Sequence, residues 1–301
     1  MLTKKFNSVL QFDTIKVDGQ NKVQPVQWRE FKKSDSTKRK IKEAGLENEI
    51  DDTVDVEANY NLRKIVGYGA TSVVFKAHKF DSVSEAIGAA GPGGDMIELE
   101  EKDSSADKKC EVVAIKKIKN IFENDIYAHR ILRELRLLRI LKGHRNIMSV
   151  KSIMRPKDPA NFKSLNLVAE YCTQNLMNVI RYNADTLKAD QIKYLSFEIL
   201  KGINFMHSKG IIHRDLKPLN VLVTQDWDVK ISDFGQSNVQ TGSINQDYNL
   251  TKYVTTRYYR APELYLNYSS NYGPGVDMWA FGCIIAEFFT KKVFVKAATS
   301  E

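Results

Sequence analysis

The chain has 301 residues, enough for one large domain or two modest ones with a buried core. Its 43% hydrophobic and 27% charged residues are typical of an ordinary globular protein. The net charge of +8 permits nucleic-acid binding, but no base-reading motif accompanies it, so phosphate-rich ligands and acidic partners explain the charge as well.

The cysteines and the apolar segments bear on the compartment. Cys110, Cys172 and Cys283 are widely spaced and odd in number, which argues against a disulfide framework and favours a reducing environment. The first residues contain no apolar run long enough for a signal peptide, and the most apolar segment, 276–289, is too short and too charged to span a bilayer. We therefore expect a cytoplasmic or nuclear protein that has no membrane and no nucleic-acid partner.

Residues 1–59 are predicted to form an N-terminal extension that is partly disordered. Residues 28–42 carry seven basic and two acidic side chains, and residues 43–57 carry seven acidic and no basic ones. Such opposed blocks are typical of solvated helix faces or mobile tails, and a docking or localisation arm is the alternative.

Two predicted strands, 60–66 and 72–77, flank a turn that contains Gly67 and Gly69. Glycines permit tight turning and let backbone N–H groups approach phosphate oxygens. A dinucleotide fold would need a helix after the glycines, whereas a Val-Val-Phe strand follows them here. The segment therefore predicts a loop that covers ATP, with a plain hairpin as the alternative. The residues expected to contact ATP are Val66, Gly67, Tyr68, Gly69, Ala70, Thr71, Ser72, Val73 and Val74.

The following segments alternate between loop, strand and helix signals. Residues 82–109 are rich in glycine and then in acidic polar residues, which predicts a flexible surface insert. A strand over 112–116 and a helix over 124–141 come next, followed by a strand over 165–172. Helical signals then occupy 176–207 and 276–289.

The most informative segment is 213–220, His-Arg-Asp-Leu-Lys-Pro-Leu-Asn, which precedes an Asp-Phe-Gly triplet that begins at Asp233. Asp215 can accept the proton of an attacking hydroxyl, and Lys217 can offset the charge that develops on a phosphoryl group. Asn220 and Asp233 supply the hard oxygen ligands that Mg²⁺ prefers. The pattern predicts a phosphoryl-transfer site, and a charged surface loop is the alternative.

These motifs resemble those of the eukaryotic protein kinases. The pair Thr251 and Tyr253, in register with Ala-Pro-Glu at 261–263, is similar to the activation segment of the mitogen-activated protein kinases in the proline-directed group. The resemblance implies an α+β, bilobal fold with an antiparallel N-lobe sheet, one main helix and a mainly helical C-lobe. It divides the chain into the 1–59 extension, an N-lobe over 60–171 with its insert at 82–109, and a partial C-lobe over 172–301.

The resemblance also assigns roles to residues outside the central motif. Lys116 would contact the α- and β-phosphates and pair with Glu134, although a surface lysine and a helix-surface ion pair are the alternatives. Glu170 and Cys172 would lie at the adenine-binding hinge. Asp277 would hold the backbone of the 213–220 loop. For its neighbours Trp279 and Phe281 no such role is expected, and both are predicted simply to pack in the core.

The activation segment is expected to respond to phosphorylation of Thr251 and Tyr253, because each phosphate adds negative charge that arginines can pair. Arg214 and Arg130 are the candidates for phosphorylated Thr251. The activation-segment and substrate residues implied by the resemblance are Arg214, Thr256, Arg257 and Arg260. Arg260 would favour substrates with proline after the phosphoacceptor, since proline has no N–H to leave unpaired.

The resemblance implies a monomeric serine/threonine protein kinase that uses ATP and Mg²⁺. Its partners would be proteins with Ser/Thr-Pro sites and an upstream dual-specificity kinase. The alternatives are a catalytically impaired, kinase-like binding or scaffold protein, and another proline-directed kinase of the cyclin-dependent type. In the family, further helices follow the segment 276–289 and one supplies an arginine partner for Glu263, so the C-lobe is expected to be incomplete.

Overall fold

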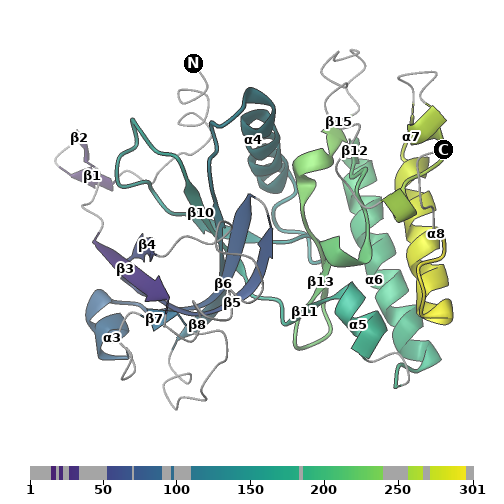
Figure 1. The fold of residues 1–301 in the computed structure, drawn as a ribbon, viewed down its shortest axis with the longest axis horizontal. Helices are drawn as coiled ribbons and strands as arrows, with labels where there is room; N and C mark the ends of the chain where they lie inside the picture. The colour runs from purple at the N-terminus through teal and green to yellow at the C-terminus, as the bar shows by residue number, and fades with distance from the viewer. Residues whose placement is uncertain are drawn as a thin grey trace. The chain divides into compact units, whose positions relative to one another are not determined.

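The computed structural model describes residues 15–17, 20–22, 27–33, 53–69, 71–89, 96–97, 110–182, 186–239, 257–266 and 272–295 (Figure 1). The chain divides into two compact units, which are described separately. The first comprises residues 1–128 and 150–171, and the second comprises residues 129–149 and 172–301. Within the described ranges, no helix is long and apolar enough to cross a membrane.

A five-stranded antiparallel sheet forms the centre of the first unit. Its strands are β5 (Tyr60–Gly69), β6 (Ser72–Lys79), β8 (Glu111–Ile118), β10 (Leu165–Glu170) and β9 (Val150–Ile153), in that spatial order. The predicted strands over 60–66, 72–77 and 112–116 are confirmed, and each is longer in the structure. The antiparallel sheet agrees with the α+β class expected from the sequence.

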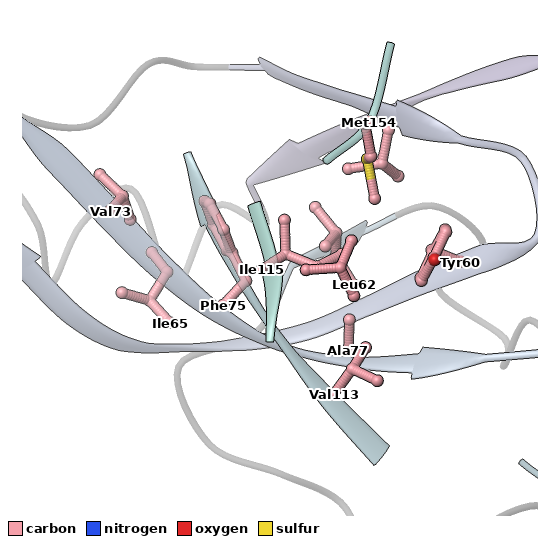
Figure 2. Close-up of a cluster of buried hydrophobic side chains, with 11 residues drawn as sticks. Tyr60, Leu62, Ile65, Val73, Phe75, Ala77, Val113, Ile115 and Met154 are labelled. Carbon is pink, nitrogen blue, oxygen red and sulfur yellow. The ribbon is translucent and has the colours of Figure 1, made fainter. Parts of the chain in front are cut away.

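One face of this sheet carries the core of the first unit. Val73 and Phe75 in β6 lie in one buried cluster with Val113 and Ile115 in β8 (Figure 2). These residues occupy alternate positions, and alternate side chains of a strand point to the same face. The residues between them therefore face the other side of the sheet. Truncating a fully buried phenylalanine such as Phe75 to alanine costs about 3–5 kcal/mol, because it leaves a cavity.

Parts of the N-terminal extension form strands as well. β1 (Ile15–Val17) pairs with β2 (Gln20–Lys22), while β3 (Trp28–Lys33) pairs antiparallel with β4 (Thr53–Glu57) and parallel with β7 (Met96–Ile97). Val56 in β4 is fully buried in the core cluster of the first unit. The end of the acidic block at 43–57 is therefore a packed strand rather than the solvated face or mobile tail that its charges suggested.

The insert between β6 and β8 begins with a helix, α3 (Val83–Gly88), where the composition predicted a flexible loop. Ser82 Oγ accepts the Glu85 backbone N–H at 3.2 Å, and the Glu85 carboxylate accepts the Ser82 N–H at 3.3 Å. This reciprocal capping box satisfies two donors that a short helix would otherwise leave exposed. Asn61 Nδ2 in β5 donates to Ala86 O at 2.8 Å and ties the helix to the sheet.

Helices and short strand pairs form the second unit. Helix α4 (Asp125–Ile140) continues into it and is followed by α5 (Leu176–Tyr182), α6 (Ala189–Ser208), α7 (Glu263–Leu266) and α8 (Gly275–Thr290). β13 (Val221–Val223) pairs with both β11 (Gln174–Asn175) and β14 (Val229–Ile231), and β12 (Ile211–Ile212) pairs with β15 (Asn238–Val239). α6 contacts both β14 and α8 (Figure 1). The predicted helices are confirmed, the one over 176–207 being divided into α5 and α6.

Helix α8 places its buried residues at intervals of three and four, the pattern of a helix with one face in a core. Asp277 and Glu287 belong to this buried face together with apolar residues. Trp279 lies outside it and is 43% exposed, and Phe281 is only partly buried. The expectation that Trp279 packs in the core is therefore wrong, because the orientation of the helix is set by residues on another face.

Candidate active site

The three residues expected to be catalytic are in mutual contact in the loop between β12 and β13. Asp215 is 9% exposed, and its Oδ2 accepts hydrogen bonds from Lys217 Nζ at 2.7 Å and from Asn220 Nδ2 at 3.2 Å. Asn220, at the end of the 3-10 helix η2 (Pro218–Asn220), also donates to the backbone carbonyl of Asp215 at 2.9 Å. The lysine and amide thus fix one carboxylate oxygen. Within the described part of the chain, Asp215 Oδ1 accepts no hydrogen bond.

A buried carboxylate on α8 holds the backbone of this loop. Asp277 is fully buried, and it accepts the backbone N–H of His213 at 2.8 Å and that of Arg214 at 2.9 Å. The ring Nε2 of His207, near the end of α6, lies 2.8 Å from the same carboxylate. Arg214 has a positive φ of 69°, which is costly for a non-glycine residue unless its surroundings impose it. The role expected of Asp277 is confirmed by these bonds.

The strand β14 brings the Asp233 backbone next to Asn220. Ser232 donates from its N and its Oγ to Asn220 O, at 2.9 and 3.0 Å, and Ser232 O lies 3.0 Å from His213 Nε2. Asp233 is exposed and has φ 65° and ψ 71°, while Phe234 after it is fully buried. Its backbone is thus fixed on both sides although its carboxylate is accessible.

Asn220 and Asp233 fit the ligand preferences of Mg²⁺. Asn220 directs its Nδ2 to Asp215, which leaves the amide carbonyl Oδ1 as a ligand. Among the described residues, no group of three or more His, Cys, Asp or Glu side chains could hold a metal ion. Mg²⁺ commonly takes only one or two protein carboxylates, with water and substrate phosphates completing its octahedron. A donor set of one amide and one carboxylate is therefore compatible with a nucleotide-bound Mg²⁺.

In the first unit, the glycine-containing turn joins β5 to β6 with Gly69 opposite Ser72. The Thr71 carbonyl at the tip accepts the Tyr127 hydroxyl at 3.2 Å and thereby ties the turn to α4. Ala70 lies outside the described residues. The remaining expected ATP contacts on β5 are Val66 and Tyr68, which are exposed, and Gly67, which is half-buried.

The pairing register divides the other expected ATP contacts between the two faces of the sheet. Lys116 pairs with Val74 in β6 and with Leu167 in β10. Directly paired residues point to the same face of a sheet, so the side chains of these three point to the face opposite the core cluster that contains Val73. Val73 belongs to the core cluster and is 1% exposed, so its side chain points away from that face.

The remaining expected nucleotide contacts are distributed over both units. Lys116 belongs to the first unit, and Glu134, 8% exposed in α4, belongs to the second. Glu170 ends β10 in the first unit, whereas Cys172 begins a segment of the second, and both are half-buried. The Lys116–Glu134 ion pair and the adenine contacts therefore remain predictions.

Much of the activation segment lies outside the described residues: Thr251, Tyr253, Thr256 and the side chain of Arg257. The description resumes with the 3-10 helix η5 (Arg257–Tyr259). Arg260 is half-buried with its guanidinium carbon 5.7 Å from the centre of the Tyr265 ring, a cation–π distance. Arg214 lies 5.1 Å from the Tyr272 ring in the same way.

Arg130, the second candidate for the Thr251 phosphate, lies near Asp233, the aspartate expected to bind Mg²⁺. Burial, and then the charge of Arg133, hold the pKa of Arg130 below its ordinary value, and the charge of Asp233 opposes them. Arginine side chains stay protonated in folded proteins, so the guanidinium remains positively charged. Arg130 thus places positive charge in the neighbourhood of Asp233.

A second buried carboxylate on α8 was missed by the sequence reasoning. Tyr259 donates its hydroxyl to Glu287, and the two side chains are 4% and 3% exposed. Burial, together with this hydrogen bond, raises the pKa of Tyr259, so the phenol stays protonated and able to donate. Burial and the Glu287 charge also raise the pKa of Cys283. The available signal was a glutamate inside an apolar helix, which needs a donor if it is buried.

His207 and Ser232 were missed as well, and they hold the same loop. Neither belongs to a motif with a characteristic spacing, because their partners, Asp277 and Asn220, are brought to them only by folding. A histidine near a helix end or a serine after a strand can have many ordinary structural roles, so the sequence alone does not single it out. Only the tertiary contacts distinguish them.

Comparison with known proteins agrees with this geometry. The family model described as "Protein kinase domain" matches residues 102–301, about two thirds of the chain. The "Mitogen-activated protein kinase homolog NTF3" of Nicotiana tabacum is 46% identical over 182 residues, covering 60% of this chain and 47% of the relative. "Mitogen-activated protein kinase 7" of Arabidopsis thaliana is 45% identical over the same length, covering 48% of its own chain. The chain thus spans about half the length of these relatives. Because the family model covers the 213–220 loop, the Asp-Phe-Gly triplet and the carboxylate of Asp277 that supports the loop, the chain belongs to the protein kinase family.

Proposed function

We propose that the protein transfers the γ-phosphoryl group of ATP to serine or threonine hydroxyls of other proteins. The observation that carries this is the joining of Asp215, Lys217 and Asn220 to the segment that follows β14 and bears Asp233, through direct hydrogen bonds inside one unit. A charged surface loop would not need a fully buried aspartate beneath its backbone.

Each catalytic residue has a chemical task that its contacts permit. The substrate hydroxyl oxygen attacks the γ-phosphorus as the bond to the bridging oxygen breaks and ADP leaves. The hydroxyl proton passes to Asp215 Oδ1, the oxygen that Lys217 and Asn220 do not occupy. Lys217 places positive charge beside the attacked phosphoryl group. When bound, Mg²⁺ supplies charge neutralisation for the phosphates through Asn220 and Asp233.

The finer features of the activity rest on the resemblance and on the relatives. Phosphorylation of Thr251 and Tyr253 by an upstream dual-specificity kinase activates the protein, with Arg214 and Arg130 pairing the phosphate on Thr251. Substrates carry proline after the phosphoacceptor, and Arg260, held over Tyr265, contributes to that preference. The protein acts as a cytoplasmic or nuclear monomer. The names of the relatives, mitogen-activated protein kinases, support these proposals.

The test is a phosphoryl-transfer assay with the full chain after incubation with an activating dual-specificity kinase. Asp215→Asn should lower transfer by about 10²–10⁴-fold, because removing a general base has effects of that size. Asp226→Asn is the matched control, since this exposed aspartate lies in the same unit and contacts none of the catalytic groups. Equal transfer by the Asp215→Asn variant would overturn the proposal.

Two peptides and one variant test specificity in the same assay. A Ser-Pro peptide should be phosphorylated faster than its Ser-Ala counterpart, and Arg260→Ala should reduce that ratio. An unchanged ratio would contradict the role of Arg260 but not the kinase activity. Wild-type protein that binds ATP without transfer would instead favour a kinase-like binding protein.

A further inference from the structure

A buried polar pair lies outside the catalytic loop, between α6 and the strand that leads to Asp233. Asn146 is fully buried and Glu198 is 3% exposed. Asn146 Nδ2 donates to Glu198 Oε2 at 2.7 Å and to Val229 O at 3.2 Å. Burial disfavours the charged form of Glu198, but the hydrogen bonds from Asn146 and Lys201 outweigh it and hold the pKa of that carboxyl below its ordinary value. The pair is therefore a charged anchor that the catalytic chemistry does not use, and within the described residues the buried Asn146 Oδ1 accepts no hydrogen bond.

The backbone of Asn146 holds the other end of the same strand. Asn146 O accepts the Ile231 N–H at 2.9 Å, and Ile231 O accepts the Met148 N–H at 2.9 Å. Ile147 and Ile231 form an isolated parallel bridge. Strand β14 is thus paired with β13 on one side and with residues 146–148 on the other. Asn146 contacts both Val229 and Ile231, the two ends of β14.

Helix α6 packs against this junction without room for one more atom. A Cβ on Gly202 would lie 2.7 Å from Ile231 Cδ1, 3.1 Å from Asn146 O and 3.2 Å from Asn146 Cβ. Glu198 and Gly202 are four residues apart and so lie on the same face of the helix. The glycine permits the close approach that brings the Glu198 carboxylate to Asn146.

We propose that Asn146, clamped by Glu198 and seated against Gly202, is a positioning residue that sets where β14 delivers Asp233 to its Mg²⁺ ligand position. One residue, Ser232, separates β14 from Asp233, and Ser232 bonds directly to Asn220 O. A displacement of β14 is therefore passed to Asp233 and to its distance from Asn220. The position of Asp233 is sensitive to such a displacement because its backbone is left-handed, and such conformations persist only where the surroundings impose them. The inference rests on the proposed function for the role of Asp233, but not for the fixing of β14.

The first arm of the test measures the strand without nucleotide or metal. Hydrogen exchange of the full chain, followed by mass spectrometry, would compare a peptide over 229–236 with a reference peptide over 276–288. Asn146→Ala should speed exchange of the first peptide by about tenfold, the effect of losing one hydrogen bond's worth of protection, and leave the reference unchanged. Uniform acceleration of both peptides would show a purely structural role and overturn the proposal.

The second arm measures the metal site. Electron paramagnetic resonance would follow Mn²⁺ binding in the presence of a non-hydrolysable ATP analogue. The Mn²⁺ concentration at half-saturation should rise about tenfold in Asn146→Ala. The KM for a peptide substrate should stay within about twofold, since Asn146 is fully buried and so out of reach of a peptide. An unchanged Mn²⁺ concentration with altered exchange would overturn the coupling to Asp233.

If Asn146→Ala does not fold, variants of Glu198 test the proposal in its place. Glu198→Gln keeps an acceptor for Asn146 Nδ2 and should behave as wild type, whereas Glu198→Leu keeps the size without an acceptor and should reproduce both effects. Lys201→Met is the matched control, because Lys201 bonds to the other carboxylate oxygen at 3.0 Å and does not touch Asn146. Equal behaviour of Glu198→Gln and Glu198→Leu would sink the proposal. A wild-type protein with the expected exchange pattern but no phosphoryl transfer would count against the proposed function alone.

Discussion

The loop that carries Asp215 and the turn that carries Gly69 are held in opposite ways. The Asp215 loop is fixed by buried side chains, among them Asp277, which accepts the backbone N–H groups of His213 and Arg214. The Gly69 turn is held mainly by the backbone pairing of β5 with β6 and by the tie at Thr71 O, while flanking side chains such as Tyr68 are exposed. Proton transfer needs a fixed carboxylate, whereas a backbone that covers phosphates needs space around it. Single substitutions should therefore affect stability strongly in the loop and weakly in the turn.

Asp277→Ala should cause the largest loss of stability, because it leaves the His213 and Arg214 N–H groups and the His207 ring without their acceptor. We expect the free energy of unfolding to fall by about 3–5 kcal/mol, the range for breaking a buried charged network. Urea unfolding monitored by circular dichroism measures this, with Asp226→Ala as the exposed control. A loss equal to that of the control would mean that the loop does not depend on α8.

Tyr259→Phe should have an intermediate effect. It removes the donor to Glu287 and leaves a buried carboxylate unsatisfied, at about 1–3 kcal/mol of unfolding free energy. The neighbouring, less buried Tyr258 provides the control variant Tyr258→Phe. If both variants unfold at the same urea concentration, the hydrogen bond to α8 contributes nothing measurable.

Acid should distinguish a buried carboxylate of the second unit from an exposed one of the first. Hydrogen bonds hold the pKa of Glu198 below its ordinary 4.5, and the Lys151 hydrogen bond, against a weaker effect of burial, does the same for Glu111. A carboxyl whose folded pKa is depressed contributes stability above its unfolded pKa and loses it as pH falls through the folded value. Stability should thus fall below pH 4.5 more steeply in the wild type than in Glu198→Gln.

Glu111→Gln should flatten the same acid curve less than Glu198→Gln does. Its ion pair with Lys151 is exposed and screened by salt, whereas Glu198 is buried. Thermal unfolding between pH 3 and 6, repeated at high salt, measures both. A larger effect of Glu111 would reverse the expected order.

Gly69→Ala should have the smallest effect on stability. A Cβ there meets no atom within 4 Å, so the free energy of unfolding should stay the same or rise by up to about 1 kcal/mol. The KM for ATP should nevertheless increase, since the added methyl group occupies space that the proposed function assigns to phosphates. Gly282→Ala on α8, where a Cβ also meets nothing, should leave that KM unchanged. Equal KM values for the two variants would contradict the phosphate role of the turn.

The sequence was most informative where chemistry depends on residues close together in the chain. Asp215, Lys217 and Asn220 lie within six positions, so their contact follows from one tight loop, and Asp277 was found from its place in a known motif. The strands and helices with regular apolar spacing were also predicted, because period and burial agree there. The helix α3 was missed although its Ser-x-x-Glu cap is legible at Ser82, since the glycine-rich composition of the whole insert outweighed it.

The sequence by itself determined which chemistry to propose, because the residue types expected for phosphoryl transfer and their spacing are local. Tertiary structure alone decided which groups support that chemistry. Nothing in the spacing pairs Asn146 with Glu198, 52 positions later, or Tyr259 with Glu287, 28 positions later. Such pairs form only after helices pack, and a buried polar atom takes whichever partner the packing brings within reach. The same packing turned Trp279 outward, since a helix presents to its core the face that its buried residues share.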